Sequence, residues 1–399
     1  MRRSAIPESH PSHASPPDQF HSIVPPHIFK HMAELPETHW PGLADRALES
    51  MALAAELRAE RCAMAGVSAL RQAAGEGPMR TVFDAQHGFS LPGHVVRKEG
   101  EESTGDDTVD EAYDALGATY MYYSLVHGRD SIDGRGLRMD ATVHYRRSFN
   151  NAFWNGRQMV FGDGDGEIFG RFTRSLDIIG HELTHGVTQY EAGLDYQDQS
   201  GALNEHMSDV FGSLVKQYTL KQTAKKADWL IGEGLWAPGI KGKALRSMKA
   251  PGTAYDDPRI GSDPQPANMR DYVDTDDDNG GVHINSGIPN HAFYLAAVAL
   301  GGRAWSRAGK VWYHALTQTL RRDANFAQAA TAIVEAAGTK FGKNVANTVR
   351  GAWKQVGIEV ISSTRRSTRR KVALAGGAQH GGRTRANPRG ADRRHRRAS

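Results

Sequence analysis

Residues 181–185 read His181-Glu182-Leu183-Thr184-His185, and Glu205 follows twenty positions after the second histidine. On a helix, His181 and His185 are four residues apart, so both rings project from one face and can share one metal ion. Two neutral imidazoles and one carboxylate leave a fourth tetrahedral position open, which is typical of a catalytic zinc site. Glu182 lies beside the rings, where it can take a proton from a water that the zinc makes acidic.

Two predicted helices carry these residues. The apolar residues around the motif predict a largely buried helix. A second helical run, from about residue 202 to 218, places Glu205 and Asp209 on one face. Asp209 is a suitable acceptor for the ring N–H of one ligand histidine, and Asn204 for that of the other. Taken alone, the motif could instead be a buried helix with two histidines, Asp209 a solvated residue and Asn204 a helix-start residue.

Further stretches accompany the motif in a fixed order: 150–156, 162–166, Tyr196, 201–205, 245–248 and 279–287. With the motif, they resemble the thermolysin family (M4) of metallopeptidases over roughly residues 80–358. The resemblance implies an α+β fold of two domains. The N-terminal half is expected to be β-rich and the C-terminal half mainly α-helical, with the zinc cleft between them.

The resemblance also implies catalytic roles. Glu182 is expected to act as general base and then as general acid. Tyr196 and His283 are expected to donate hydrogen bonds to the oxyanion that forms during peptide hydrolysis. Asp278 matches the carboxylate that keeps His283 cationic, although it belongs to an acidic cluster at residues 274–278. Without the resemblance, a core tyrosine and a loop histidine are the simpler interpretations.

Substrate contacts follow from the same resemblance. Asn151 and the backbone of Ala152 are expected to pair with an extended peptide, as an added strand pairs with a sheet edge. Arg246 is expected to bind a substrate carbonyl. Ile178 and Leu245 match positions that line the pocket for the residue after the cut, although core packing alone would also explain them. The implied function is a zinc-dependent neutral endopeptidase that cuts on the N-terminal side of large hydrophobic residues.

The calcium sites of the family are altered in this chain. Asp177, Asp228 and Glu233 match positions of a paired calcium site, but Lys216 and Leu230 stand at two further positions of that site. Neither can bind calcium as a carboxylate does. We expect the Lys216 ammonium to replace one cation, which leaves at most one weak calcium site.

The domain organisation is expected to have four parts. Residues 1–75 form an N-terminal propeptide, 76–180 the β-rich domain, 181–358 the α-helical domain and 359–399 a basic, disordered tail. Pro25-Pro26-His27-Ile28-Phe29 is similar to the short propeptide of the protealysin-like branch of the family, which implies an intramolecular inhibitor and a self-inhibited precursor.

The propeptide itself divides into two stretches. Residues 1–40 are rich in proline and histidine and are expected to be mostly irregular, whereas residues 43–73 have the apolar spacing of one or two helices. We expect propeptide removal near residues 70–80. The only cysteine, Cys62, lies in this extension and excludes an intrachain disulfide. It could block the zinc as a thiolate, but an incidental helix thiol is the simpler interpretation.

The tail accounts for the basic pI of the chain. Residues 361–399 contain twelve Lys/Arg and one acidic residue, a net of +11, which leaves about −7 for residues 1–360 of a chain with net charge +4. Such a tail could contact nucleic acid or another anionic surface through salt-sensitive interactions. A dispensable solvated tail explains the composition equally well.

The sequence gives conflicting indications of the cellular compartment in which the protein acts. Relatives of thermolysin are usually secreted, but residues 1–10 have basic residues without an apolar core behind them, so a standard secretory signal is not expected. Export by another route or a cytoplasmic location would be consistent with this sequence. No run of eighteen apolar residues is present, so no membrane span is expected.

Two other function classes compete with a protease. A non-catalytic peptide-binding scaffold could use a degenerate protease fold, and a nucleic-acid-associated protein could act through the tail. The complete set of zinc ligands, Glu182, Tyr196 and His283 favours the enzyme.

Overall fold

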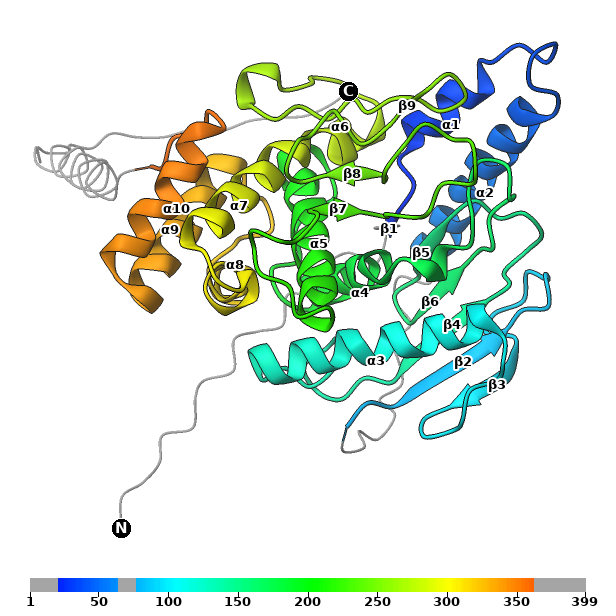
Figure 1. The fold of residues 1–399 in the computed structure, drawn as a ribbon, viewed down its shortest axis with the longest axis horizontal. Coiled ribbons are helices and arrows are strands. Elements are labelled where there is room, and N and C mark those ends of the chain that lie inside the picture. The colour runs from blue at the N-terminus through cyan, green and yellow to red at the C-terminus, as the bar shows by residue number, and fades with distance from the viewer. Residues whose placement is uncertain (1–20, 64–76, 362–399) are drawn as a thin grey trace, which may run out of the picture. The chain divides into compact units, whose positions relative to one another are not determined.

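Six strands form one mixed sheet in the order β1-β5-β6-β4-β2-β3 (Figure 1). The computed structural model describes residues 21–63 and 77–361, and the described residues up to 360 belong to one compact unit. Strand β4 pairs in parallel with β2 and β6, and the other pairs are antiparallel. The strands are β1 (His21–Ser22), β2 (Arg80–Asp84), β3 (His94–Lys98), β4 (Met139–Val143), β5 (Ala152–Trp154) and β6 (Gln158–Phe161).

The long helix α3 (Asp107–His127) packs against β2 and β4, as Figure 1 shows. Asp106 is the N-cap of this helix, and its side chain accepts hydrogen bonds from the backbone N–H groups of Thr108 and Val109. All four residues of β6 are buried, which is typical of a strand covered on both faces. The first half of the chain therefore combines the mixed sheet with one long helix.

The chain after residue 175 is mainly helical. Its helices are α4 (Leu176–Tyr190), α5 (Asp198–Thr219), α6 (Asp278–Asn285), α7 (Gly287–Leu300), α8 (Ala308–Gln318), α9 (Phe326–Phe341) and α10 (Lys343–Gln355). Two short strand pairs lie between α5 and α6: β7 (Leu230–Ile231) with β8 (Arg246–Ser247), and β9 (Asp256–Asp257) with β10 (Gly261–Ser262). The sheet-rich first half and the helical second half confirm the predicted α+β class.

Helices α4 and α5 pack against each other at unusually short range. A Cβ atom on Gly212 of α5 would lie 2.4 Å from the carbonyl oxygen of Asp177 on α4. That separation is closer than two non-bonded atoms tolerate, so only glycine fits at this position. The close approach brings the histidines of α4 next to Glu205 of α5.

The first described segment is more regular than the sequence suggested. Residues 21–22 form β1, and α1 (Pro26–Ala33) and α2 (Leu43–Ala63) follow. The expectation of a mostly irregular segment is wrong for residues 26–33, because Pro26 occupies the first turn of α1, where a missing N–H costs nothing. Buried Ile28, Phe29 and Met32 anchor this helix. The proposed removal point lies partly in residues 64–76, outside the described residues, and so does the tail beyond 361.

The segment over residues 250–286 has regular structure of its own. It contains the β9–β10 pair and α6, whose first four residues, 278–281, all have positive φ. A Cβ on Gly280 would lie 2.1 Å from an Asp198 carboxylate oxygen, so a glycine is required there.

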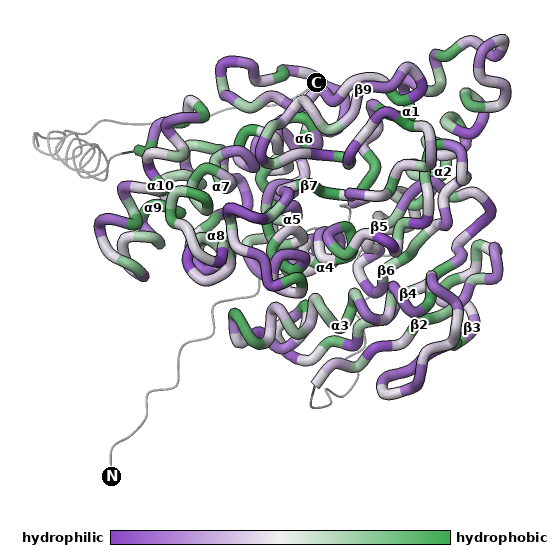
Figure 2. The backbone as a smooth tube through the Cα atoms, viewed as in Figure 1, coloured by the Kyte–Doolittle hydropathy of each residue, from purple (hydrophilic) through white to green (hydrophobic). Residues whose placement is uncertain are grey.

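Figure 2 shows hydrophobic and hydrophilic residues alternating along surface helices such as α3. That alternation is typical of helices with one face on a core and one face in water. Among the helices in the described part of the chain, none is both long enough and apolar enough to cross a bilayer.

Candidate active site

Three potential metal ligands converge where α4 meets α5. The Nε2 atoms of His181 and His185 lie 3.0 Å apart, and each is 3.4 Å from a carboxylate oxygen of Glu205. All three side chains are fully buried. The helical spacing in the sequence predicted this convergence on α4, and the tight helix pair supplies the third group.

The outer ring nitrogens determine which tautomer each histidine adopts. His181 Nδ1 lies 2.8 Å from a carboxylate oxygen of Asp209, and His185 Nδ1 lies 2.9 Å from Asn204 Oδ1. The amide of Asn204 is oriented by its donation to the Leu194 carbonyl, so its oxygen faces His185. Both Nδ1 atoms therefore donate, and both Nε2 atoms present lone pairs.

The converging atoms fit a divalent cation. Two nitrogen lone pairs and a carboxylate repel one another unless a positive charge lies between them. Glu205 Oε2 is buried without a hydrogen-bond partner among the described residues. Two imidazoles and one carboxylate match zinc, with a position left for water or substrate.

Glu182 faces the same space from α4. Its Oε2 accepts a hydrogen bond from the backbone N–H of Trp154 at 3.1 Å, and its buried Oε1 has no hydrogen-bond partner in the described chain. Burial is the main reason that the pKa of Glu182 rises to about 8. A carboxylate with one oxygen anchored and one oxygen available can exchange a proton with water.

Tyr196 and His283 also contact Glu205. The Tyr196 hydroxyl donates to Glu205 and lies 3.3 Å from His283 Nε2. His283 donates from Nδ1 to Asp278 at 2.7 Å, and its backbone N–H donates to the second oxygen of Asp278 at 2.9 Å. Burial opposes a charge on His283, but Asp278 and Glu205 outweigh it and raise the pKa to about 9.

The acidic cluster therefore divides into residues with different contacts. Asp278 binds His283, whereas Asp277 forms an ion pair with Lys30 of α1 at 2.5 Å. The family resemblance pointed to Asp278, whereas spacing alone could not choose between these carboxylates, because the choice depends on the positive-φ turn at the start of α6.

The residues predicted to contact substrate are all buried. Asn151 and Ala152 lie at β5, which pairs with β1. Strand β1 belongs to the N-terminal segment, by which we mean the chain before residue 77. Arg246 is fully buried and forms two hydrogen bonds with Asp209, at 2.9 and 2.8 Å. Ile178 and Leu245 are also buried. A cavity beside Asn151, Tyr196, Asp278 and His283 is closed by residues of the N-terminal segment and of α2, among them Ser22, Val24, Met51 and Ala54.

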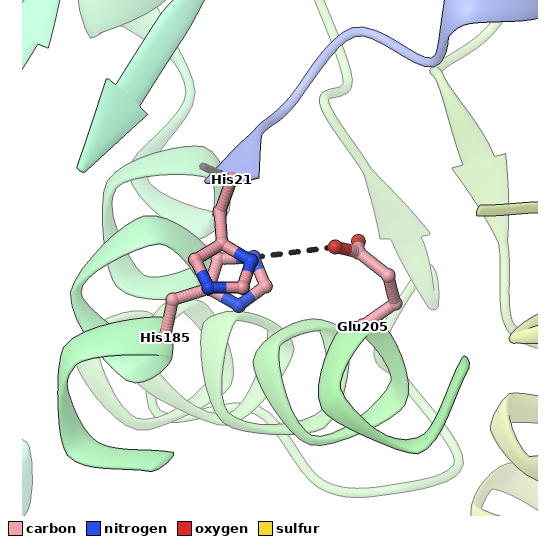
Figure 3. Close-up of side chains that lie close together, drawn as sticks. All are labelled: His21, His185 and Glu205. Atoms are coloured by element: carbon pink, nitrogen blue, oxygen red, sulfur yellow. Dashed lines mark ion pairs between the residues drawn. The ribbon is translucent and has the colours of Figure 1, made fainter. Parts of the chain in front are cut away.

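His21 is a residue that sequence reasoning missed. Its ring stacks on His185 with centroids 4.0 Å apart and an angle of 11° between the planes, and it meets Tyr196 edge-on. Figure 3 shows both rings beside the carboxylate of Glu205. Ligand atoms of His21, His185 and Glu205 all lie within 4.8 Å of one another. No sequence spacing indicates this contact, because it joins segments more than 160 residues apart.

The positions that match the calcium site of the family lie elsewhere. Lys216 Nζ lies 2.7 Å from Asp177, 3.0 Å from Asp228 and 2.9 Å from the carbonyl oxygen of Leu230. Burial, together with the charge of Asp228, raises the pKa of Glu233.

The comparisons with known proteins agree with this geometry. The model of the thermolysin metallopeptidase catalytic domain matches residues 50–189, and that of the thermolysin metallopeptidase α-helical domain matches residues 192–358. The chain is 56% identical over 282 residues to an extracellular metalloprotease of Pectobacterium carotovorum subsp. carotovorum, covering 70% of this chain and 81% of the relative. This chain belongs to the thermolysin family of metallopeptidases.

Other members of the thermolysin family extend the comparison. Protease PrtS of Photorhabdus sp. (strain Az29) is 52% identical over 284 residues, covering 70% of this chain and 76% of that protein. The precursor of protealysin, a metalloproteinase from Serratia proteamaculans, has a similar structure with a TM-score of 0.77 and 52% identity, covering 85% of this chain and 99% of that one. The family, the protealysin-like branch and the metallopeptidase class are thereby confirmed.

Proposed function

We propose that His181, His185 and Glu205 hold one zinc ion and that Glu182 is the general base of a neutral endopeptidase made as an inactive precursor. The observation that carries the assignment is the convergence of two lone-pair-bearing Nε2 atoms and a buried carboxylate, with Glu182 Oε1 available beside them. Bound zinc would lower the pKa of a water to roughly 7 and polarise the substrate carbonyl.

Side chains of the protein perform the remaining steps of the proposed hydrolysis. Glu182 takes a proton from the attacking water and passes it to the leaving amine. Tyr196 and His283 donate to the developing oxyanion, and Asp278 holds His283 in its donating form. Asp209 and Asn204 orient the two ligand histidines.

Substrate placement follows from β5 and Arg246. An extended peptide can pair with Asn151 and Ala152, while Arg246 donates to one of its carbonyl groups. The buried apolar side chains of Ile178 and Leu245 support a preference for a large hydrophobic residue after the cut. Among the relatives, the Pectobacterium protein is named an extracellular metalloprotease, and we propose that this protein also acts outside the cell.

We further propose that calcium has no structural role at Asp177, Asp228 and Glu233. The ammonium group of Lys216 already occupies the position between Asp177 and Asp228. The basic tail is proposed to make salt-sensitive contacts with anionic surfaces.

The specificity is tested on a pool of peptides of known sequence. The enzyme is freed of its N-terminal segment, incubated with the pool, and the products are identified by mass spectrometry beside a Glu182→Gln control. We expect cuts before large apolar residues by the wild type alone. Cuts without such a preference would contradict the pocket assignment, and equal cutting by Glu182→Gln would contradict the mechanism.

A further inference from the structure

The chain places one of its own peptide bonds across the proposed catalytic groups. The Ser22 carbonyl oxygen lies 3.2 Å from His283 Nε2. The next backbone N–H, that of Ile23, donates to the Ala152 carbonyl at 3.2 Å. The carbonyl and the amide nitrogen of the Ser22–Ile23 bond are therefore each held by a group of the site.

The backbone groups that follow this bond also form hydrogen bonds with residues of the site. The Ile23 carbonyl accepts a hydrogen bond from Arg246 Nη1 at 3.3 Å, and the Val24 N–H donates to Asn151 Oδ1 at 3.2 Å. Asn151 and Arg246 are also the residues that we assigned to an extended substrate. The segment therefore makes the contacts that we proposed for a substrate.

The residue before the bond is anchored as well. His21 pairs in register with Trp154 of β5, and its ring stacks on His185. The N–H of Trp154 holds Glu182. The proposed general base is thus fixed to the strand residue that faces the position just before Ser22.

The side chain of Ile23 satisfies the proposed specificity. It is fully buried in the main apolar core, which also contains Ile178 and Leu245. A large aliphatic residue thus follows the bond, as the proposed pocket requires.

We propose that the Ser22–Ile23 bond is an intramolecular processing site, cut by the protein's own active site. The inference rests on the endopeptidase function proposed above. Water adds to the Ser22 carbonyl carbon and the C–N bond breaks. Ser22 then ends in a carboxylate, and the amine of Ile23 takes the proton that Glu182 removed from the water.

This cut does not by itself activate the enzyme. After it, Ile23 and Val24 keep their hydrogen bonds to Ala152, Arg246 and Asn151, and α1 remains anchored by its buried side chains. The new N-terminus therefore stays in the cleft. Cleavage at residue 22 and release of inhibition are two separate events, and the second requires removal of α1 and α2.

The test uses the full chain, purified with a chelator and then supplied with one equivalent of zinc. Intact mass spectrometry follows the appearance of the 23–399 fragment and of the 1–22 peptide. Because the bond is already held in the site, we expect a first-order rate constant that is unchanged over a roughly tenfold range of protein concentration. The matched Glu182→Gln chain is expected to stay intact.

Two variants test the register of the segment. Ile23→Leu is expected to be cut at a rate similar to the wild type. Ile23→Asp is expected to be cut at least ~100-fold more slowly, because its carboxylate would have to enter an apolar pocket. Equal cutting of Ile23→Asp and the wild type would overturn the proposal.

A mixing experiment tests whether the cut is intramolecular, and it needs no substitution in the N-terminal segment. Wild-type chain is mixed with an affinity-tagged Glu182→Gln chain, and we expect only the wild type to be cut at Ser22–Ile23. Cutting of both chains at one rate would overturn the intramolecular step.

The same preparation, freed of its N-terminal segment by limited trypsin digestion, is assayed on an external peptide with a large apolar residue. Cutting of that peptide while the precursor keeps its Ser22–Ile23 bond would overturn this inference and leave the proposed function intact. Failure to cut either bond with zinc bound would overturn both.

Discussion

Arg246 and Asp209 form a buried, two-point ion pair behind the proposed zinc site. The same Asp209 carboxylate accepts from His181 Nδ1 and from Asn290. Burial opposes ionisation of Asp209, but Arg246 and His181 hold its pKa well below the usual range. One carboxylate therefore orients a proposed metal ligand and the arginine that binds the carbonyl of Ile23.

This shared carboxylate makes Arg246→Lys an informative change. Lysine keeps the charge but cannot bind Asp209 at two points and also donate to a substrate carbonyl. We expect kcat/KM for an apolar peptide to fall roughly 10- to 100-fold, which is the loss of one hydrogen bond involving a charged group. Arg259→Lys is the matched control, because Arg259 also binds Asp257 at two points but lies in the β9–β10 turn. An equal loss of kcat/KM in both variants would contradict the assigned role.

Because Lys216 forms these ion pairs, we predict that the folded protein is stable without calcium. Lys216→Met leaves Asp177 buried without a partner cation, so we expect the free energy of unfolding to fall by about 3 kcal/mol. Urea denaturation in the presence of a calcium chelator measures this. The control is Arg321→Met, whose pair with Asp323 is exposed and contributes at most about 1 kcal/mol. A wild-type melting temperature that drops sharply on chelation would show instead that calcium is part of the fold.

His144 predicts a pH dependence of stability away from the proposed zinc site. Its Nδ1 lies 2.9 Å from Asp163 and its Nε2 lies 3.1 Å from Asp106. The hydrogen bond with Asp163 is the main reason that the pKa of His144 rises from 6.5 to about 9. A pKa that is higher in the folded state stabilises the fold below pH 6.5, and that stabilisation is lost as the pH rises through about 9.

The variant His144→Gln isolates this contribution. We expect it to lower the free energy of unfolding by about 1 kcal/mol at pH 6, a figure reduced for partial exposure to solvent, and by much less at pH 10. Urea denaturation at the two pH values measures the difference. The same loss at both values would mean that packing, and not the ion pairs, is responsible.

The sequence was sufficient wherever spacing along a helix determined the geometry. His181, His185 and Glu182 follow from α4 alone, and Asp209 and Glu205 share a face of α5. Tyr196 and His283 required the family resemblance, because the turns that place them have no periodic pattern. The structure then brought all of these side chains together.

Contacts between distant segments could not be predicted from the sequence. The stacking of His21 on His185 and the alignment of Ser22–Ile23 depend on the pairing of β1 with β5, which no local pattern indicates. The prediction of an irregular N-terminus failed at α1 because it rested on the overall proline and histidine content of residues 1–40. Pro26 in fact begins the helix.

The central claim is tested most directly by zinc titration of the metal-free enzyme after removal of its N-terminal segment. We predict that peptide hydrolysis rises with added zinc and reaches its maximum at one equivalent per chain. Glu182→Gln should bind the same single zinc but hydrolyse the peptide at least ~100-fold more slowly. Full activity in the metal-free enzyme, or undiminished activity in Glu182→Gln, would contradict the account.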